Sequence, residues 1–332
     1  MKIGCDFPTL LQTFFTDRLM AQRNVSPHTI AAYRDTFRLL FAYAQEYLEK
    51  PPSALTLEDL DSSFIGNFLD HLEHARHNGA RSRNARLAAV RSFFRYAAYQ
   101  LPEHSSLVQR VLTLPSKKYQ RTLIEYLTQE ETNAILDAPD RHTWSGRRDY
   151  ALLLVAIQTG LRVSELSGLC GRDVTLGTGA HLRCLGKGRK MRCTPLTRSV
   201  VAVLKAWLKE QDNPSSDPLF PNRKGGRLSA DGVQLILAKH TAVARRQCPS
   251  LTKKKISPHV LRHTAAMNLL HAGAAPATIA LWLGHENLET VHIYVEADLA
   301  MKQEILAKTA APKGSVQRFQ PDDALLAFLK DL

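Results

Sequence analysis

The sequence predicts an α+β protein that is mainly helical, carries a small β-sheet and is divided into two domains. Apolar residues recur at three- and four-residue steps through the first third of the chain, and one later segment has the pattern of a β-hairpin. The length of 332 residues corresponds to roughly two domains of about 150 residues, each able to bury its own core. We expect a helical domain at residues 1–105, a linker at 106–126, a mixed domain at 127–311 and a tail at 312–332.

Four helical stretches with short connections form the first domain. The first covers residues 10–23, and the second begins at Ser26 and Pro27, which make an N-cap and first-turn pair. Thr56 is expected to cap the third helix, and the fourth covers residues 81–99. Helices of this number and spacing pack as a compact bundle.

The helical period is lost between residues 101 and 126. This stretch contains Pro102 and Pro115, followed by the basic residues Lys117 and Lys118. Proline and charge without periodicity are typical of an interdomain linker.

The second domain is expected to begin with a capping box, T-x-x-E, at Thr128. A buried helix over residues 151–158 ends at Gly160, where a positive φ would suit the C-cap. Ser164 can cap a short helix that follows.

A β-hairpin comes next, with strands at residues 181–185 and 191–196 and the turn G-K-G-R at 186–189. The remainder of the domain is helical again, with caps at Ser229 and Ser257.

The charge balance favours a polyanionic partner. Lys and Arg number 44 against 31 Asp and Glu, which gives a net charge of +13. The longest apolar run, residues 150–157, is well short of the ~18 residues that a membrane span needs, and the N-terminus lacks a secretory signal pattern. The five cysteines are scattered without a C-x-x-C pair, which indicates reduced thiols and gives no zinc framework. We therefore expect a cytoplasmic protein, associated with the nucleoid, that binds nucleic acid rather than membrane.

Arginines are concentrated in the fourth helix, where residues 74–102 contain no acidic residue. Such a patch repels itself unless phosphates neutralise it, although a solvated basic face is the alternative. The candidate DNA contacts are Arg76, Arg81, Arg83, Arg86, Arg91 and Arg95 in the first domain, Lys117 and Lys118 in the linker, and Lys239, Arg245 and Arg246 in the second domain.

Four segments of the second domain form one constellation. They are T-G-L-R-V-S-E-L-S-G-L at 159–169, L-G-K-G-R-K at 185–190, H-V-L-R-H at 259–263, and L-G-H at 283–285 with Tyr294 nine positions after His285. In this order and spacing they resemble the catalytic signature of the tyrosine recombinases, the family of phage integrases and Xer-type resolvases. The resemblance covers the whole second domain, and the first domain is similar to the SAM-like core-binding domain of that family. It implies a two-domain clamp around DNA.

The residue types suit cleavage of a phosphodiester. That reaction needs a nucleophile, cations that stabilise the pentavalent phosphorane and a proton donor for the leaving oxygen. Tyr294 supplies a phenol, and Arg162 and Arg262 can each place a bidentate fork on the non-bridging oxygens. His259 and Arg262, at i and i+3 near a helix start, can reach one phosphate.

The resemblance adds roles for three further residues. It implies that Lys187 is the general acid for the 5′ oxygen, that His285 donates a hydrogen bond to the scissile phosphate and that Glu165 orients its neighbours. His263 is expected to be a packing or surface residue.

The activity that the resemblance implies is site-specific DNA recombination through a 3′-phosphotyrosyl link and a free 5′ hydroxyl. It needs no ATP, metal or other cofactor. The partner is double-stranded DNA, and four protomers assemble around two duplexes. The tail carries an apolar stripe at residues 325–332, which we expect to dock into a neighbouring protomer or, alternatively, onto its own domain.

Three alternatives remain at this point. A zinc enzyme using His259, His263 and His285 would lack the glutamate expected directly after its first histidine, where Val260 stands, and would place Arg262 beside the cation. A catalytically silent DNA-binding protein would not need every catalytic position filled. A type IB topoisomerase shares the chemistry, but the short chain favours recombination.

Overall fold

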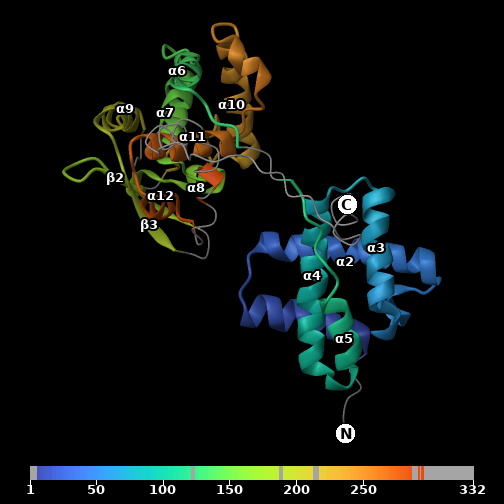
Figure 1. Ribbon diagram of the computed structural model, residues 1–332. Helices are drawn as coiled ribbons and strands as arrows, with labels where there is room; N and C mark the ends of the chain where they lie inside the picture. Colours follow the sequence, from blue (N-terminus) through green and yellow to red (C-terminus); the bar gives the residue numbers. More distant parts are fainter. Residues whose placement is uncertain are drawn as a thin grey trace, which may run out of the picture. The chain divides into compact units, whose positions relative to one another are not determined.

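The computed structural model describes residues 6–120, 124–186, 190–211, 217–285, 291, 293 and 294 (Figure 1). The chain forms two compact units, residues 1–121 and 122–332. Each unit has its own buried core. The mainly helical fold with a small sheet is as the sequence predicted.

In its described part, the first unit consists of helices and connecting loops and has no strand. Its elements are α1 (Phe7–Thr13), the π-helical η1 (Phe14–Gln22), α2 (Pro27–Leu48), α3 (Ser62–His74), α4 (Ala80–Gln100) and α5 (Ser105–Leu112), with short 3₁₀ turns at Pro52–Ala54, Glu58–Leu60 and Pro102–His104. Helix α4 contacts α2, α3 and α5 (Figure 1). Its residues Val90, Phe93 and Phe94 are fully buried, so α4 carries the centre of this core.

Local hydrogen bonds fix where the first helices begin. Ser26 Oγ accepts the backbone N–H of Thr29, as expected for an N-cap before Pro27. The predicted cap at Thr56 is wrong. Helix α3 starts at Ser62 with Asp61 as its cap, because the Asp61 carboxylate accepts the N–H of Phe64 at 2.7 Å.

The predicted linker at residues 106–126 is also wrong at its start. Helix α5 occupies this region, and its residues Val108 and Val111 are fully buried in the first core. They lie one helical turn apart, so even eight residues present an apolar edge to α3 and α4. The helix belongs to the first unit.

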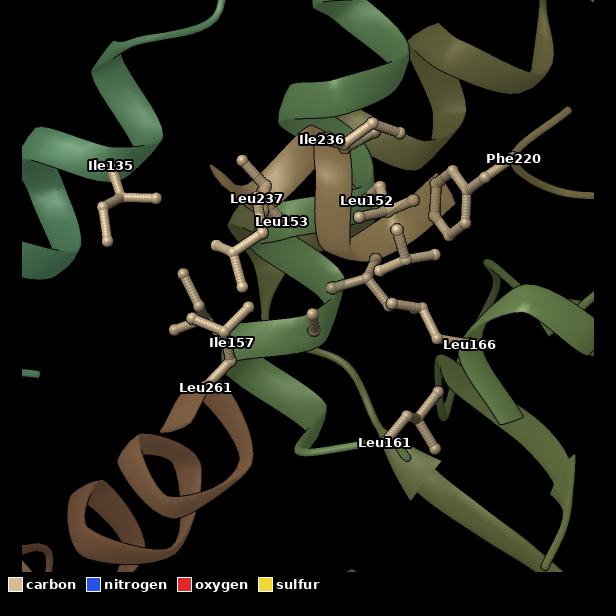
Figure 2. Close-up of a cluster of buried hydrophobic side chains, with 14 of the residues drawn as sticks. Ile135, Leu152, Leu153, Ile157, Leu161, Leu166, Phe220, Ile236, Leu237 and Leu261 are labelled. Atoms are coloured by element: carbon tan, nitrogen blue, oxygen red, sulfur yellow. The ribbon is translucent and has the colours of Figure 1, made fainter. Parts of the chain in front are cut away.

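The second unit surrounds a central helix. Its elements are α6 (Gln129–Asp137), α7 (Trp144–Thr159), α8 (Val163–Gly168), β1 (Val174–Thr175), β2 (His181–Leu185), β3 (Met191–Pro195), α9 (Arg198–Leu208), α10 (Ala230–Ala244), α11 (Pro258–His271) and α12 (Pro276–Leu283), with 3₁₀ turns at Gly171–Asp173 and Pro249–Lys253. Leu152, Leu153 and Ile157 of α7 meet side chains of α10 and α11 in the core (Figure 2). The core thus holds together segments that are far apart in the sequence.

The predicted hairpin is confirmed, and one further strand, β1, pairs with it. Strands β1, β2 and β3 form an antiparallel sheet in that order, with Cys184 opposite Arg192. The two-residue strand β1 was not predicted, because two residues show no alternation. The capping box at Thr128 and the cap at Ser229 are confirmed.

Helix α8 begins differently from the prediction. Its N-cap is Arg162 rather than Ser164, because Glu165 Oε2 accepts the backbone N–H of Arg162 at 2.7 Å. The carboxylate at the third helical position thus satisfies the first free N–H group.

A buried ionic cluster joins α7 to α10. Asp149 accepts hydrogen bonds from Arg148 Nη2 at 2.6 Å and Arg148 Nε at 3.0 Å, and it lies 2.8 Å from Nε2 of His240. The carboxylate of Asp149 and the His240 ring are each about 2% exposed. Burial raises the pKa of Asp149, but the bonds from His240 and Arg148 outweigh it and lower that pKa below its usual value.

Within the described residues, no helix is both long enough and apolar enough to cross a membrane.

Candidate active site

Arg162 stands at the turn between α7 and α8. Helix α7 ends at Gly160 with φ of 63°, as predicted, and the chain then enters α8 at Arg162. Arg162 Nη1 donates to Glu165 Oε1 at 2.9 Å, and Nη2 donates to the carbonyl of Gly284 at 3.0 Å. Its side chain is 28% exposed, so part of the guanidinium remains accessible.

Arg262 projects from the first turns of α11 and is 5% exposed. Its Nη1 donates to the carbonyl of Gly160 at 2.6 Å, and its Nη2 donates to the carbonyl of Leu283 at 2.7 Å. Burial, followed by the charge of Arg162, lowers the pKa of Arg262 to about 10, so the side chain is still a cation at neutral pH.

The C-terminus of α12 brings the two arginines together. The carbonyls of Leu283 and Gly284, which accept from Arg262 and Arg162, lie where a helix leaves its last C=O groups without intrahelical partners. The negative end of the helix dipole favours cations there. Gly284 has φ of 65°, so the chain turns sharply before His285. A single helix end therefore positions the arginines of two distant segments beside His285.

Glu165 is the anion of the site, and its carboxylate is 3% exposed. It accepts bonds from Arg162, and Arg192 donates to both of its oxygens at 2.8 Å. Burial raises the pKa of Glu165, but the bonds from Arg192 and from Arg162 outweigh this effect and lower it. Sequence reasoning missed Arg192. The signal that could have found it is a charged residue at an inward position of β3, opposite Cys184.

Tyr294 is 1% exposed and lies among apolar side chains that include Leu283 and Val291. Its hydroxyl is 3.2 Å from Nδ1 of His263, and its ring stacks on that of His285 with centroids 6.3 Å apart. Burial raises the pKa of the phenol, and the charges of Arg262 and Arg162 oppose that effect without cancelling it.

The histidines of the site differ in their surroundings. Burial lowers the pKa of His263 to about 4, with help from His259 and Arg262, and burial beside the arginines lowers that of His285 to about 4. Both rings are therefore neutral at pH 7. His259 lies exposed on the first turn of α11. The expectation that His263 only packs or faces solvent missed its proximity to the Tyr294 hydroxyl, because residues 31 positions apart show no common pattern.

Two predicted features lie outside the described residues: Lys187 and the tail at residues 312–332. The hairpin that flanks Lys187 is closed by a bond from the N–H of Gly186 to the carbonyl of Lys190, at 2.8 Å.

Several arginines proposed as DNA contacts make hydrogen bonds within the protein. Arg83 is 6% exposed, pairs with Glu73 and donates to the carbonyl of Pro115. Arg91 donates to the carbonyl of Leu114 and to Ser116 Oγ. Similar bonds occupy Arg86, on Ala32 and Thr36, and Arg245, on Leu251 and Lys254. These four side chains hold neighbouring segments together, and their contact with phosphate stays a prediction.

The other basic candidates are more accessible. Lys117 pairs with Glu73 and Lys239 lies 3.9 Å from Asp149, yet both remain exposed. Among these candidates, five are exposed and have no partner in the described parts of the chain: Arg76, Arg81, Arg95, Lys118 and Arg246.

Among the described residues, no group of three or more His, Cys, Asp or Glu side chains could hold a metal ion. His259, His263 and His285 do not form such a group, so the zinc alternative finds no support in this part of the chain.

The family of the chain follows from comparison with known proteins. Residues 125–301 match the phage integrase family, and residues 13–100 match the N-terminal SAM-like domain of phage integrases. The chain belongs to this family. It is a tyrosine recombinase, an enzyme class that cleaves and rejoins DNA in site-specific recombination.

Relatives of nearly the same length support this membership. The chain is 57% identical over 323 residues to y4rC of Sinorhizobium fredii, which is named as an integrase/recombinase, and the match covers 97% of each protein. It is 34% identical over 300 residues to the tyrosine recombinase XerC of Pelobacter propionicus, covering 90% of this chain and 94% of the relative.

Solved structures share the fold. The XerH recombinase in its post-cleavage complex with difH has a TM-score of 0.68 at 24% identity, over 86% of this chain and 81% of XerH. The lambda integrase dimer bound to a core site has a TM-score of 0.62 at 17% identity, over 88% of this chain and 77% of that chain.

Proposed function

We propose that this recombinase cleaves one DNA strand with Tyr294 as the nucleophile and holds it as a 3′-phosphotyrosyl intermediate. The observation that carries the proposal is the meeting of Arg162 and Arg262 at the C-terminus of α12, next to His285 and the Tyr294 ring. Two guanidinium groups fixed in this way suit the non-bridging oxygens of a single phosphate.

The chemistry balances without a cofactor. Tyr294 Oη passes its proton to the neutral His263, whose Nδ1 lies 3.2 Å away, and forms a bond to phosphorus while the bond from phosphorus to the 5′ oxygen breaks. Lys187 gives that 5′ oxygen a proton. Arg162 and Arg262 stabilise the charge that develops on the phosphorane, and His259 and His285 add hydrogen bonds. Attack by a 5′ hydroxyl of the partner strand reverses these steps. Because one phosphoester replaces another, the reaction needs no ATP, and the guanidinium groups supply the charge that a metal would otherwise provide.

The phenol must become reactive and accessible. Burial raises the pKa of Tyr294, so the hydroxyl is protonated at pH 7, and the neutral His263 can accept a hydrogen bond from it. Only 1% of Tyr294 is exposed, so this side chain must become more exposed before its hydroxyl oxygen can reach a DNA phosphate. We therefore place release of Tyr294 before cleavage.

DNA binding and assembly complete the proposal. Arg76, Arg81, Arg95, Lys118 and Arg246 grip the duplex through phosphates, and four protomers join two duplexes through the tail at residues 312–332 in the cytoplasm, at the nucleoid. Truncation after Gln320 should abolish cooperative assembly on DNA in gel-shift titrations. Unchanged cooperativity in the truncated protein would contradict the role of the tail.

Replacement of Tyr294 by Phe tests the cleavage step. On a nicked suicide substrate, which traps the covalent complex, Tyr294→Phe should give no adduct while its DNA affinity stays near that of the wild type. Arg162→Ala should lower the cleavage rate by roughly a hundredfold or more with little loss of binding. An adduct in the Tyr294→Phe protein would refute the assignment of the nucleophile.

Two further assays distinguish recombination from the alternative activities. Strand exchange between two duplexes supports a recombinase, whereas relaxation of supercoiled DNA without exchange would indicate a type IB topoisomerase. A strong chelator should leave the adduct yield unchanged.

A further inference from the structure

We infer that Arg192 is a positioning residue of the cleavage site, which keeps Arg162 available for phosphate by neutralising Glu165 and fixing it in place. The inference rests on the proposed role of Arg162. It concerns a residue of β3 that lies outside the signature segments.

The geometry between Arg192 and Glu165 is that of a bidentate pair. Nη1 and Nη2 of Arg192 each lie 2.8 Å from a different oxygen of Glu165. The side chains are 12% and 3% exposed, so solvent screens the pair little. Both η nitrogens of Arg192 are therefore engaged by Glu165.

The pair decides how Arg162 is used. A carboxylate has about four acceptor sites, and Glu165 fills them with two bonds from Arg192, one from Nη1 of Arg162 and one from the Arg162 backbone N–H. Without Arg192, Arg162 would be the remaining partner of this buried anion among the described residues. It would then turn toward Glu165 and away from both the Gly284 carbonyl and the phosphate.

Packing adds a second constraint on the same guanidinium. A Cβ added at Gly284 would lie 2.9 Å from Arg192 Nη1 and 3.2 Å from its Cδ, and one added at Gly186 would lie 3.0 Å from the same Nη1. Arg192 therefore rests against the backbone of both glycines. Gly284 is also the residue whose carbonyl accepts from Arg162 and whose neighbour is His285.

A lysine cannot replace this arrangement. It offers a single point charge on a flexible chain, so it cannot donate two parallel bonds or fill the planar space beside the two glycines. The contribution of Arg192 depends on its fork as well as its charge. Burial lowers the pKa of Arg192, but the bonds that it donates to the Glu165 carboxylate outweigh that effect and raise it, so the fork stays charged.

The experiment compares Arg192→Gln and Arg192→Lys with the control Arg183→Gln. Arg183 lies on the neighbouring strand β2, and its side chain is 52% exposed. For each protein we would measure DNA affinity, the melting temperature and the adduct rate on two suicide substrates. One carries the natural scissile phosphate, and the other a methylphosphonate, which has lost one anionic oxygen and so needs less cationic stabilisation.

On the natural phosphate, Arg192→Gln should lower the adduct rate about 10- to 100-fold, as expected when a reacting group is displaced by about an ångström. The adduct rate of Arg192→Lys should lie between those of Arg192→Gln and the wild type, and the rate of Arg183→Gln should equal that of the wild type. DNA affinity should stay within about twofold, and the defect of Arg192→Gln should shrink on the methylphosphonate, as that of Arg162→Ala should.

Three results would overturn the inference: a wild-type rate for Arg192→Gln, an equal loss on both substrates, or a loss of DNA affinity that matches the loss of rate. A different result would contradict the proposed function itself: Arg162→Ala or Tyr294→Phe would still form the adduct at the wild-type rate.

Discussion

Gly160→Ala should strongly destabilise the second unit and disturb Arg262 as well. Gly160 has φ of 63°, a conformation that costs an L-residue about 1–2 kcal/mol. An added Cβ would lie 2.6 Å from Leu283 Cδ2 and 3.0 Å from Ala265 Cβ. Both neighbours are buried, at 0% and 2% exposure, so neither can move freely.

The magnitude follows from these two terms. Overpacking of a core typically costs about 1–3 kcal/mol, so the total is about 2–5 kcal/mol. For a domain of this size each kcal/mol shifts the melting temperature by about 2–4 °C, which gives a decrease of roughly 4–20 °C. Cleavage should also slow at temperatures where the variant is folded, because the carbonyl of Gly160 accepts from Arg262.

Differential scanning calorimetry checks this prediction, with Gly168→Ala as the matched control. Gly168 is the last residue of α8, and an added Cβ would meet nothing within 4 Å. This control should change stability by about 1 kcal/mol or less, and alanine is the better helix former. A melting temperature of Gly160→Ala within 1 °C of the wild type would refute the reasoning.

Three further predictions concern pH and charge. His263 and His285 have pKa values of about 4 in the folded protein, so the unfolded chain binds protons first as the pH falls. The free energy of unfolding should therefore decline between about pH 6.5 and 4, by up to about 3 kcal/mol for each histidine. Calorimetry of the second unit at pH 8, 6 and 5 measures this decline, and a flat profile would contradict it. Arg95→Ala should weaken DNA binding and reduce the slope of log K against log salt by about one. Arg91→Ala should instead lower the melting temperature of the first unit and leave that slope unchanged. Equal salt slopes for the two variants would contradict this distinction. Asp149→Asn should destabilise the second unit by about 3 kcal/mol, because Arg148 and His240 would stay buried without their anion. Urea titrations measure this loss, and a loss below about 1 kcal/mol would contradict the prediction.

Local signals in the sequence were sufficient for much of the fold. Ser26, Thr128 and Ser229 cap helices because a cap depends on residues within three positions of it. The hairpin and the end of α7 at Gly160 were predictable for the same reason. Helix α5 was missed because its apolar edge is short and lies between prolines.

The composition of α4 could not distinguish a structural arginine from an accessible one. Arg91 and Arg95 lie on the same helix, but only Arg91 meets carbonyl and hydroxyl groups of the segment after α5. Their difference depends on tertiary packing. The same holds for Arg192 and His263, whose partners Glu165 and Tyr294 lie 27 and 31 positions away.

The two carbonyls at the end of α12 have a consequence for control of the enzyme. Leu283 and Gly284 are adjacent, so a small rotation of α12 would break one bond of Arg262 and one bond of Arg162 in the same movement. The chain that continues from this point leads through His285 toward Tyr294. Disturbance of one helix end would therefore loosen both arginines together, while Gly160 still holds Arg262 and Glu165 still holds Arg162. On the proposed roles of these arginines, such a disturbance would weaken both contacts with the phosphate at once rather than one at a time.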